Sequence, residues 1–270
     1  MTSILTNNGA MVALQTLKTV NNSLEDTQNQ ISTGKEVGMA KDNSAVWAIS
    51  KSMESDIGAY ESVQDALDFG EATVAVASSG MEQIVETLKE MRELVVAGVS
   101  QNVDHNQIDA DLVQKRDTIQ SIIDSASFNG ANLLDSANVT TQLDVLGGLD
   151  PSADTITVLG VDSVADIIDQ LNLGLDDTNA AAITTEIDLA LTNAIGHAAT
   201  FGSASNRLSD QNDFVSKLTD SLKSGVSTMS DTNMEEASAR LKALQTQQQL
   251  AVQSLTIANQ SPSTLQQLFR

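Results

Sequence analysis

Residues 234–259 read MEEASARLKALQTQQQLAVQSLTIAN, and one spacing runs through the whole stretch. Side chains suited to a helix seam recur in alternating steps of three and four residues, which is the heptad spacing of a coiled coil. The positions on this seam are Met234, Ala237, Leu241, Leu244, Gln248, Ala251, Leu255 and Ala258. The pattern predicts a long C-terminal helix that presents a narrow apolar stripe to a partner helix.

The first thirty residues carry a matching stripe. Leu17, Leu24 and Ile31 are each seven residues apart, and Leu5 and Leu14 precede them. A chain that begins and ends in such stripes is expected to pair its two ends. One helix pair cannot cover all of this apolar surface, so the pattern favours a subunit of an assembly over an enzyme.

The composition narrows the fold class. Of the 270 residues, 41% are apolar but only 3% are aromatic, so the core must be built from aliphatic side chains. There are only two prolines, Pro151 and Pro262, which leaves long helices uninterrupted. These features favour helix-on-helix packing over a sandwich or barrel.

The charge and cysteine content exclude several functions. The net charge is −22, and residues 117–206 contain thirteen acids with no Lys or Arg. Such a surface repels phosphate backbones and anionic lipid, so neither nucleic acid nor a membrane is expected as a partner. The chain has no cysteine, which rules out disulfides and thiolate metal sites. The N-terminus shows no basic stretch followed by an apolar one, so no cleavable signal peptide is predicted.

The periodicity predicts a mainly α fold: a long antiparallel helical bundle with a small β-hairpin insert, plus paired N- and C-terminal coiled-coil helices. Gly70 and Gly80 lie inside the longest predicted helix and weaken it by about 1 kcal/mol each relative to Ala. The expected elements are a helix over 10–31 ended by Gly34, a helix over 43–99, a helix over 108–126, a hairpin within 138–160, a short helix over 164–171, a helix from 180 to beyond 222, and the C-terminal heptad helix.

No set of residues suggests catalysis. The two histidines, His105 and His197, lie far apart, and neither has a second ligand at metal-binding spacing. No phosphate-binding loop, dinucleotide fingerprint or nucleophile elbow is present. The sequence therefore predicts no enzyme, no cofactor, and no catalytic or metal-binding residue.

Four stretches carry recognisable motifs: the opening Ile4-Leu5-Thr6-Asn7, residues 31–35 (ISTGK) with 40–43 (AKDN), two short motifs in the helical region, and the C-terminal end. Together they resemble bacterial flagellin, the subunit of the flagellar filament. The opening is similar to the family's I-N-T-N start, and residues 31–35 with 40–43 resemble its L-S-T-G-x-R-I-N-S-A-x-D-D. Arg92-Glu93-Leu94 and Phe128-Asn129-Gly130 match its R-E-L and F-N-G signatures, and residues 258–270 match its A-N-Q…L-L-R close. Asn43 departs from the family's second Asp, and the middle of the chain is short.

The resemblance implies a domain organisation and a set of partners. Residues 1–35 and 231–270 would form a terminal coiled-coil domain of the inner tube, residues 36–137 and 178–230 a helical core domain, and residues 138–177 a small acidic insert on the outer side. Partners would be further copies of the chain, the export apparatus and a flagellin chaperone, and the filament cap and hook-junction proteins. The protein would be secreted unfolded to the extracellular filament. Alternatives are a hook–filament junction protein or another secreted coiled-coil assembly protein.

Two groups of residues would carry these functions. The resemblance also implies that the helix bearing R-E-L faces the vertebrate Toll-like receptor for flagellin, through Glu90, Arg92 and Leu94. Detected flagellins typically carry Arg where this chain has Glu90, so weak detection is expected. Polymerisation is expected to need Leu5, Leu14, Leu17, Leu24, Ile31, Leu241, Leu244, Leu255, Leu265, Leu268, Phe269 and Arg270.

Overall fold

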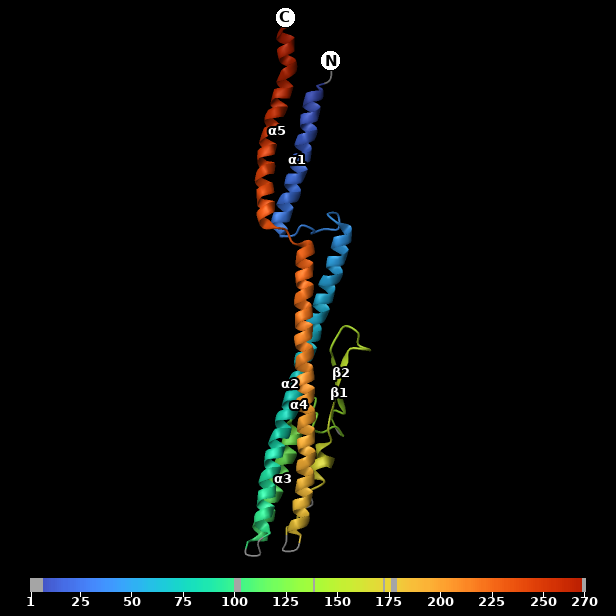
Figure 1. The fold of residues 1–270 in the computed structure, drawn as a ribbon, viewed down its shortest axis with the longest axis vertical. Coiled ribbons are helices and arrows are strands. Elements are labelled where there is room, and N and C mark those ends of the chain that lie inside the picture. Colours follow the sequence, from blue (N-terminus) through green and yellow to red (C-terminus); the bar gives the residue numbers. More distant parts are fainter. Residues whose placement is uncertain (1–6, 100–102, 138, 172, 176–178, 269–270) are drawn as a thin grey trace. The chain divides into compact units, whose positions relative to one another are not determined.

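The computed structural model describes residues 7–99, 103–137, 139–171, 173–175 and 179–268, with side chains through residue 260 (Figure 1). The chain forms two compact units. Unit 1 comprises Met1–Asp56 and Ser221–Arg270, and unit 2 comprises Ile57–Asp220. The predicted domain limits follow the resemblance rather than these units, and they stay a prediction.

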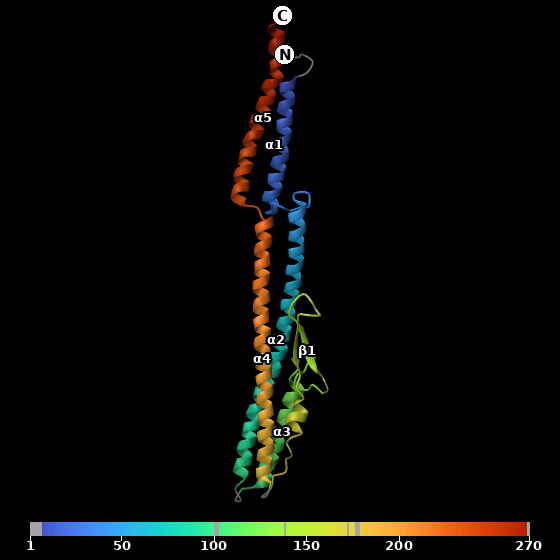
Figure 2. The ribbon, with the colours of Figure 1, turned by 45° about the vertical axis from the view of Figure 1, so that its right-hand side comes forward.

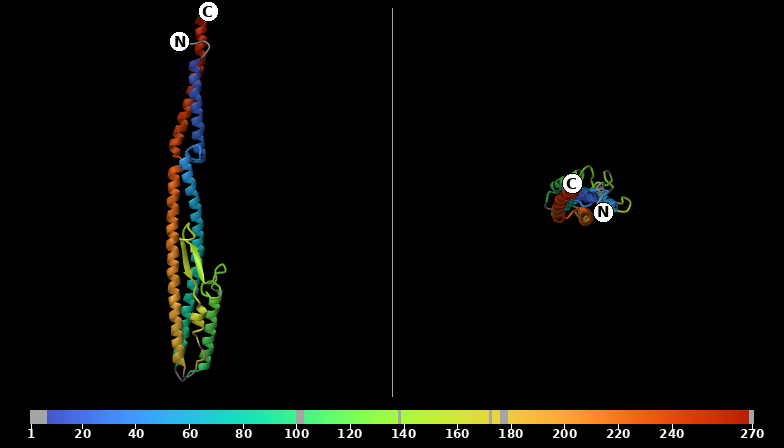
Figure 3. Two further views of the ribbon diagram at one scale, coloured as in Figure 1. Left: turned by 90° about the vertical axis from the view of Figure 1, so that its right-hand side faces the viewer. Right: turned by 90° about the horizontal axis from the view of Figure 1, so that it is seen from above.

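Unit 1 contains the paired terminal helices. Helix α1 (Asn8–Thr33) and helix α5 (Met234–Leu268) run antiparallel and side by side (Figures 1 and 3). The Asn7 side chain caps α1 by accepting from the Ala10 amide at 3.1 Å, and Gly34 ends it with φ +70°. Only a residue without a Cβ adopts this left-handed conformation readily, so the predicted end of the helix at Gly34 is confirmed.

The two breaks that flank the terminal helices are hydrogen-bonded to each other, again within unit 1. The amide of Glu36 donates to the Ser230 carbonyl at 2.7 Å, and the amide of Thr232 donates to the Gly34 carbonyl at 2.9 Å. The Ser230 hydroxyl adds a bond of 3.2 Å to the Val37 carbonyl. Residues 34–37 and 230–232 therefore form a short antiparallel pairing, which we call the crossing.

Unit 2 is a helical bundle with an aliphatic core. Helix α2 (Ser44–Gly98), helix α3 (His105–Ser125) and helix α4 (Ala180–Ser230) supply most of it, and the length predicted for α2 is confirmed. Among the described residues, the largest fully buried side chains include one aromatic, Phe201, among leucine, isoleucine and methionine. A stripe along α2 from Val63 to Val95 lies at the centre of this core.

Two of the glycines inside α2, Gly70 and Gly80, are contact points. An added Cβ at Gly70 would lie 2.6 Å from a methyl group of Val145, and one at Gly80 would lie 3.0 Å from a methyl group of Leu134. The helix thus continues through both positions, because the missing side chains let other elements approach its backbone.

The predicted hairpin is confirmed and packs on this bundle. Strands β1 (Gln142–Leu146) and β2 (Thr155–Leu159) pair antiparallel, with Val145 opposite Ile156 (Figure 2). Both of these side chains are buried in the core of unit 2, and the Gln211 side chain of α4 donates to the Gly147 carbonyl at 2.6 Å. The hairpin is therefore part of the packed core of unit 2.

The short helix predicted over 164–171 is one turn of π-helix, η1 (Val164–Ile168). The Asn193 amide on α4 donates to its Asp166 carbonyl at 2.9 Å. Asn129 and Gly130 both have positive φ, and Phe128 and Ala131 exchange two backbone hydrogen bonds of 2.9 Å around them. That is the tight turn expected from Asn-Gly. The fold class is confirmed: a mainly α chain with one small antiparallel hairpin.

Candidate functional site

The seam between α1 and α5 is formed by the predicted heptad positions except Met234, which is exposed at the start of α5. On α5, Ala237 and Leu244 are buried, and the other seam positions from Leu241 to Ala258 are half-buried. On α1, Leu17, Leu24 and Ile31 are half-buried. Polar side chains tie the seam at two levels: the Asn7 amide donates to the Ala258 carbonyl at 2.7 Å, and the Gln248 amide donates to Asn21 Oδ1 at 2.8 Å.

A second set of apolar side chains on the same helices faces solvent. Three lie on one turn of α1 and three near the middle of α5, with exposed fractions between 48% and 69%. Since the seam already uses one stripe of each helix, these side chains have no partner within the described residues of unit 1. They are Met11, Val12 and Leu14 on α1, and Leu250, Val252 and Ile257 on α5.

The predicted polymerisation residues divide into three groups. Leu14 is exposed, whereas Leu17, Leu24, Ile31, Leu241, Leu244 and Leu255 belong to the seam inside the subunit. Leu5, Phe269 and Arg270, and the side chains of Leu265 and Leu268, lie outside the described residues. Sequence reasoning missed Val12, Leu250, Val252 and Ile257, because it followed one heptad stripe. Apolar residues that fall off that stripe were the available signal.

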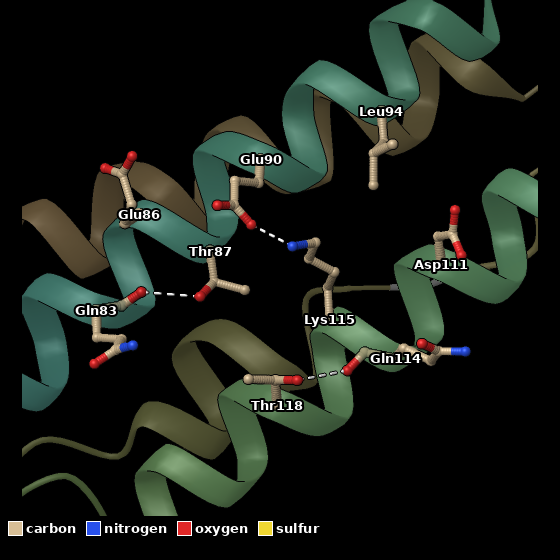
Figure 4. Close-up of a pocket in the computed structure, with 9 residues that line it drawn as sticks. All are labelled: Gln83, Glu86, Thr87, Glu90, Leu94, Asp111, Gln114, Lys115 and Thr118. Carbon is tan, nitrogen blue, oxygen red and sulfur yellow. Dashed lines mark hydrogen bonds and ion pairs between the residues drawn. The ribbon is translucent and has the colours of Figure 1, made fainter.

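The residues predicted to face the receptor all lie on α2, where Glu90 and Leu94 line a groove between α2 and α3. This groove has a volume of about 490 Å³, and its walls include Glu86, Glu90 and Asp111 (Figure 4). Lys115 of α3 reaches across it to form an ion pair with Glu90. The carboxylate of Glu90 is therefore held by a neighbouring helix of the same unit.

The other two residues of this set make different contacts, although Leu94 also lines the groove. The Arg92 guanidinium forms an ion pair of 2.7 Å with Asp188 of α4. Leu94 is half-buried and packs against the core. The three residues thus lie along one helix but make contacts with α3, α4 and the core respectively, and their role toward a receptor stays a prediction.

The histidines make structural contacts. His105 Nε2 lies 2.9 Å from the Gly98 carbonyl at the turn between α2 and α3, and His197 Nε2 lies 3.0 Å from an Asp166 carboxylate oxygen. In the part of the chain that the structure describes, no group of three or more His, Cys, Asp or Glu side chains is arranged to hold a metal ion. None of the described helices combines the length and apolarity needed to span a bilayer.

Paired terminal helices with unsatisfied apolar faces, joined to an aliphatic bundle, define a self-associating structural subunit. Residues 4–139 match the bacterial flagellin N-terminal helical region, and residues 184–269 match the bacterial flagellin C-terminal helical region. Over its whole length the chain is 39% identical to the flagellin of Brucella melitensis biotype 1, with 100% of both chains covered. It is 38% identical to flagellin FljM of Caulobacter vibrioides, covering 100% of this chain and 99% of that one. The chain belongs to the bacterial flagellin family.

Solved structures share the fold. The crystal structure of Bacillus cereus flagellin superposes with a TM-score of 0.52 at 24% identity, covering 56% of this chain and 88% of that chain. A putative flagellar hook-associated protein from Vibrio parahaemolyticus gives 0.58 at 15% identity, covering 70% and 100%. Both similarities concern the fold alone.

The family defines the function. The protein is a structural subunit of the bacterial flagellar filament, which forms by self-association of flagellin and serves motility. Flagellins are structural proteins and are not known as enzymes.

Proposed function

We propose that the terminal helices are the part of this flagellin that holds the filament together. In this proposal, residues 1–35 and 231–270 form the inner tube, residues 36–137 and 178–230 form the helical core domain, and residues 138–177 form the outer insert. The exposed apolar side chains of α1 and α5 carry the proposal, since they need a covering that the subunit does not supply.

Burial in neighbouring subunits would stabilise the assembly substantially. Fully burying a large aliphatic side chain contributes about 1.5–3 kcal/mol, and these six side chains still expose between 48% and 69% of their surface. Six such residues on each subunit would outweigh the cost of ordering a helix pair whose own seam is narrow. Free monomers would therefore keep less ordered terminal arms, and assembly would complete their packing.

The same proposal covers secretion and partners. A chain without cysteine, whose terminal arms become fully ordered only when they are covered, suits export in an unfolded state through the flagellar export apparatus, with a chaperone protecting the apolar ends beforehand. The cap and the hook-junction proteins would then contact the two ends of the filament, on the outside of the cell. A hook–filament junction role is the alternative, and it would place the protein only at the base of the filament.

The experiment is seeded polymerisation of purified monomer, followed by sedimentation and electron microscopy. Deleting residues 262–270 should abolish filaments while leaving the thermal unfolding of the core nearly unchanged. Ile257→Ser should raise the critical concentration about tenfold or more, since about 1.4 kcal/mol corresponds to a factor of ten.

The matched control is Val96→Ser, which removes a similarly exposed branched side chain from α2. It should polymerise like the wild type. Filaments formed equally well by the deletion and by Ile257→Ser would show that the terminal helices do not hold the assembly together.

A further inference from the structure

One cation of unit 2 stands apart from the others. Unit 2 contains six Lys and Arg residues. Lys89, Arg92, Lys115 and Arg116 each form an ion pair with a nearby carboxylate, and Lys217 also has a partner. Arg207 on α4 is exposed, and no hydrogen bond or ion pair joins it to another of the described residues. In a chain with a net charge of −22, this is an available positive group on an acidic surface.

Arg207 stands at the edge of an apolar groove, which we call the α4 groove. The groove has a volume of about 460 Å³ and lies between β2 and residues 199–207 of α4. Its walls are mostly apolar, with Leu159 exposed by 62%, and Arg207 is the one charged residue among the described residues that line it.

A second apolar groove, the α2 groove, lies on the other strand of the hairpin. It has a volume of about 410 Å³ and is bounded by α2, the turn at Phe128 and β1. Phe69 is exposed by 63% on its wall, and Asp144 is the one charged residue among its described lining. The two grooves are therefore alike in size and apolarity and opposite in charge.

The carboxylate of Asp144 is fixed in place. The Thr157 hydroxyl donates to it at 2.7 Å and the Gln142 amide at 2.8 Å. These two hydrogen bonds, that of Thr157 first, hold the pKa of Asp144 below its ordinary value, so the group stays ionised at neutral pH. No ion pair joins Asp144 and Arg207 within the chain, although both are described.

A helical filament needs interfaces of one particular kind. Copies related by a helical operation meet through two different surface patches, one on each neighbour, because a patch that paired with itself would close a dimer. Each subunit must therefore carry complementary patches. The α2 groove and the α4 groove meet this requirement, since each is apolar and each offers the charge that the other lacks.

We propose that the α2 groove of one copy packs against the α4 groove of the next copy, with Asp144 of the first paired to Arg207 of the second. This contact rests on the filament function and adds to the terminal helices a second interface in unit 2. Phe69 would be covered by the neighbour's apolar wall, and the charge pair would set the register between copies.

The test uses charge reversal in full-length monomers mixed with filament seeds. Arg207→Glu and Asp144→Arg should each raise the critical concentration at least about tenfold, because each places like charges across the contact. An equimolar mixture of the two variants should polymerise again, since alternating copies restore an opposite pair at every contact. Thermal unfolding of each variant confirms that the monomer is folded.

The mixture separates a contact between copies from one within the chain. Rescue by the double variant but not by the mixture would overturn the proposal, because it would place the pair inside one subunit. The matched controls Arg116→Glu and Asp124→Arg reverse the same charges on α3, and both should polymerise normally. Equal impairment in the controls, or filaments from both single variants at the wild-type critical concentration, would also overturn it. In each of these cases, assembly of the wild-type protein in the same assay would leave the proposed role of the terminal helices unaffected.

Discussion

The hairpin packs closely on α2 at Gly70, so replacing this glycine by alanine should have two opposing effects on stability. Replacing Gly by Ala inside a helix normally stabilises it by about 1 kcal/mol. At Gly70, however, the new Cβ would lie 2.6 Å and 3.0 Å from the two methyl groups of Val145. The side chain of Val145 is buried, and because it is branched at Cβ it has little freedom to move. Overpacking of this kind costs about 1–3 kcal/mol.

The net effect of Gly70→Ala should therefore range from neutral to a loss of about 2 kcal/mol in the free energy of unfolding. The matched control is Gly196→Ala on α4, in the same unit, where an added Cβ would meet no described atom within 4 Å other than its chain neighbours and the adjacent backbone of its own helix. That variant should gain about 1 kcal/mol. The two variants should differ by about 1–3 kcal/mol, or roughly 3–9 °C in Tm for a unit of this size.

Monomer unfolding followed by circular dichroism in urea and by heat measures both variants. The double variant Gly70→Ala with Val145→Ala adds a coupling test, because removing the two methyl groups should turn the Gly70 change into a stabilising one. If Gly70→Ala stabilises as much as Gly196→Ala, or if its effect is the same in both backgrounds, the close packing of the hairpin on α2 does not limit stability.

Three further outcomes are expected. In limited proteolysis of dilute monomer, α1 and α5 should be cut first while residues 57–220 persist, and filaments should protect both helices; equal protection in monomer and filament would contradict assembly-linked ordering. Wild-type monomer should activate the vertebrate flagellin receptor weakly in reporter cells, and Glu90→Arg should partly restore signalling, although the change also places a cation beside Lys115; strong wild-type activity would refute this. Hydrogen bonds from Lys51, the larger effect, and from Lys35 lower the pKa of Glu54. The ion pair between Lys35 and Glu54, which joins residue 35 to α2, should therefore hold above about pH 4.5 and weaken as the pH falls through the folded-state pKa of Glu54. The protection factor for amide exchange near residue 36, corrected for the intrinsic pH dependence of exchange, should then fall in acid, whereas in Glu54→Gln it should show no such pH dependence.

The helices and the hairpin could be predicted because they depend on local patterns. The spacing along α2 and α5, the cap at Gly34 and the Asn129-Gly130 turn are each written within a few neighbouring residues. The packing of the hairpin could not be predicted, because it depends on a contact between Val145 and Gly70. Neither stretch of sequence contains a signal that specifies this contact. From the sequence, Gly70 is expected to weaken the helix. In the structure, its lack of a side chain leaves room for Val145 to pack against the helix.

The candidate site was predictable in part for the same reason. A heptad pattern identifies the stripe that one helix presents to another, and that stripe proved to be the seam inside the subunit. The outward-facing Val12 and Ile257 lie off the predicted stripe, so their role depends on which stripe the seam already occupies. Likewise, Arg207 is unremarkable in the sequence, and only the ion pairs made by the other cations of unit 2 distinguish it.

The crossing has a mechanical consequence. Every covalent path from α1 or α5 to the rest of the chain passes through residues 34–43 or 231–233. Because backbone hydrogen bonds join these two segments, tension applied to either terminal helix is shared between both segments. The bonds use main-chain groups, so most side-chain substitutions should leave this load sharing intact. Proline is the exception at Glu36 and Thr232, since it removes the amide that makes the connection.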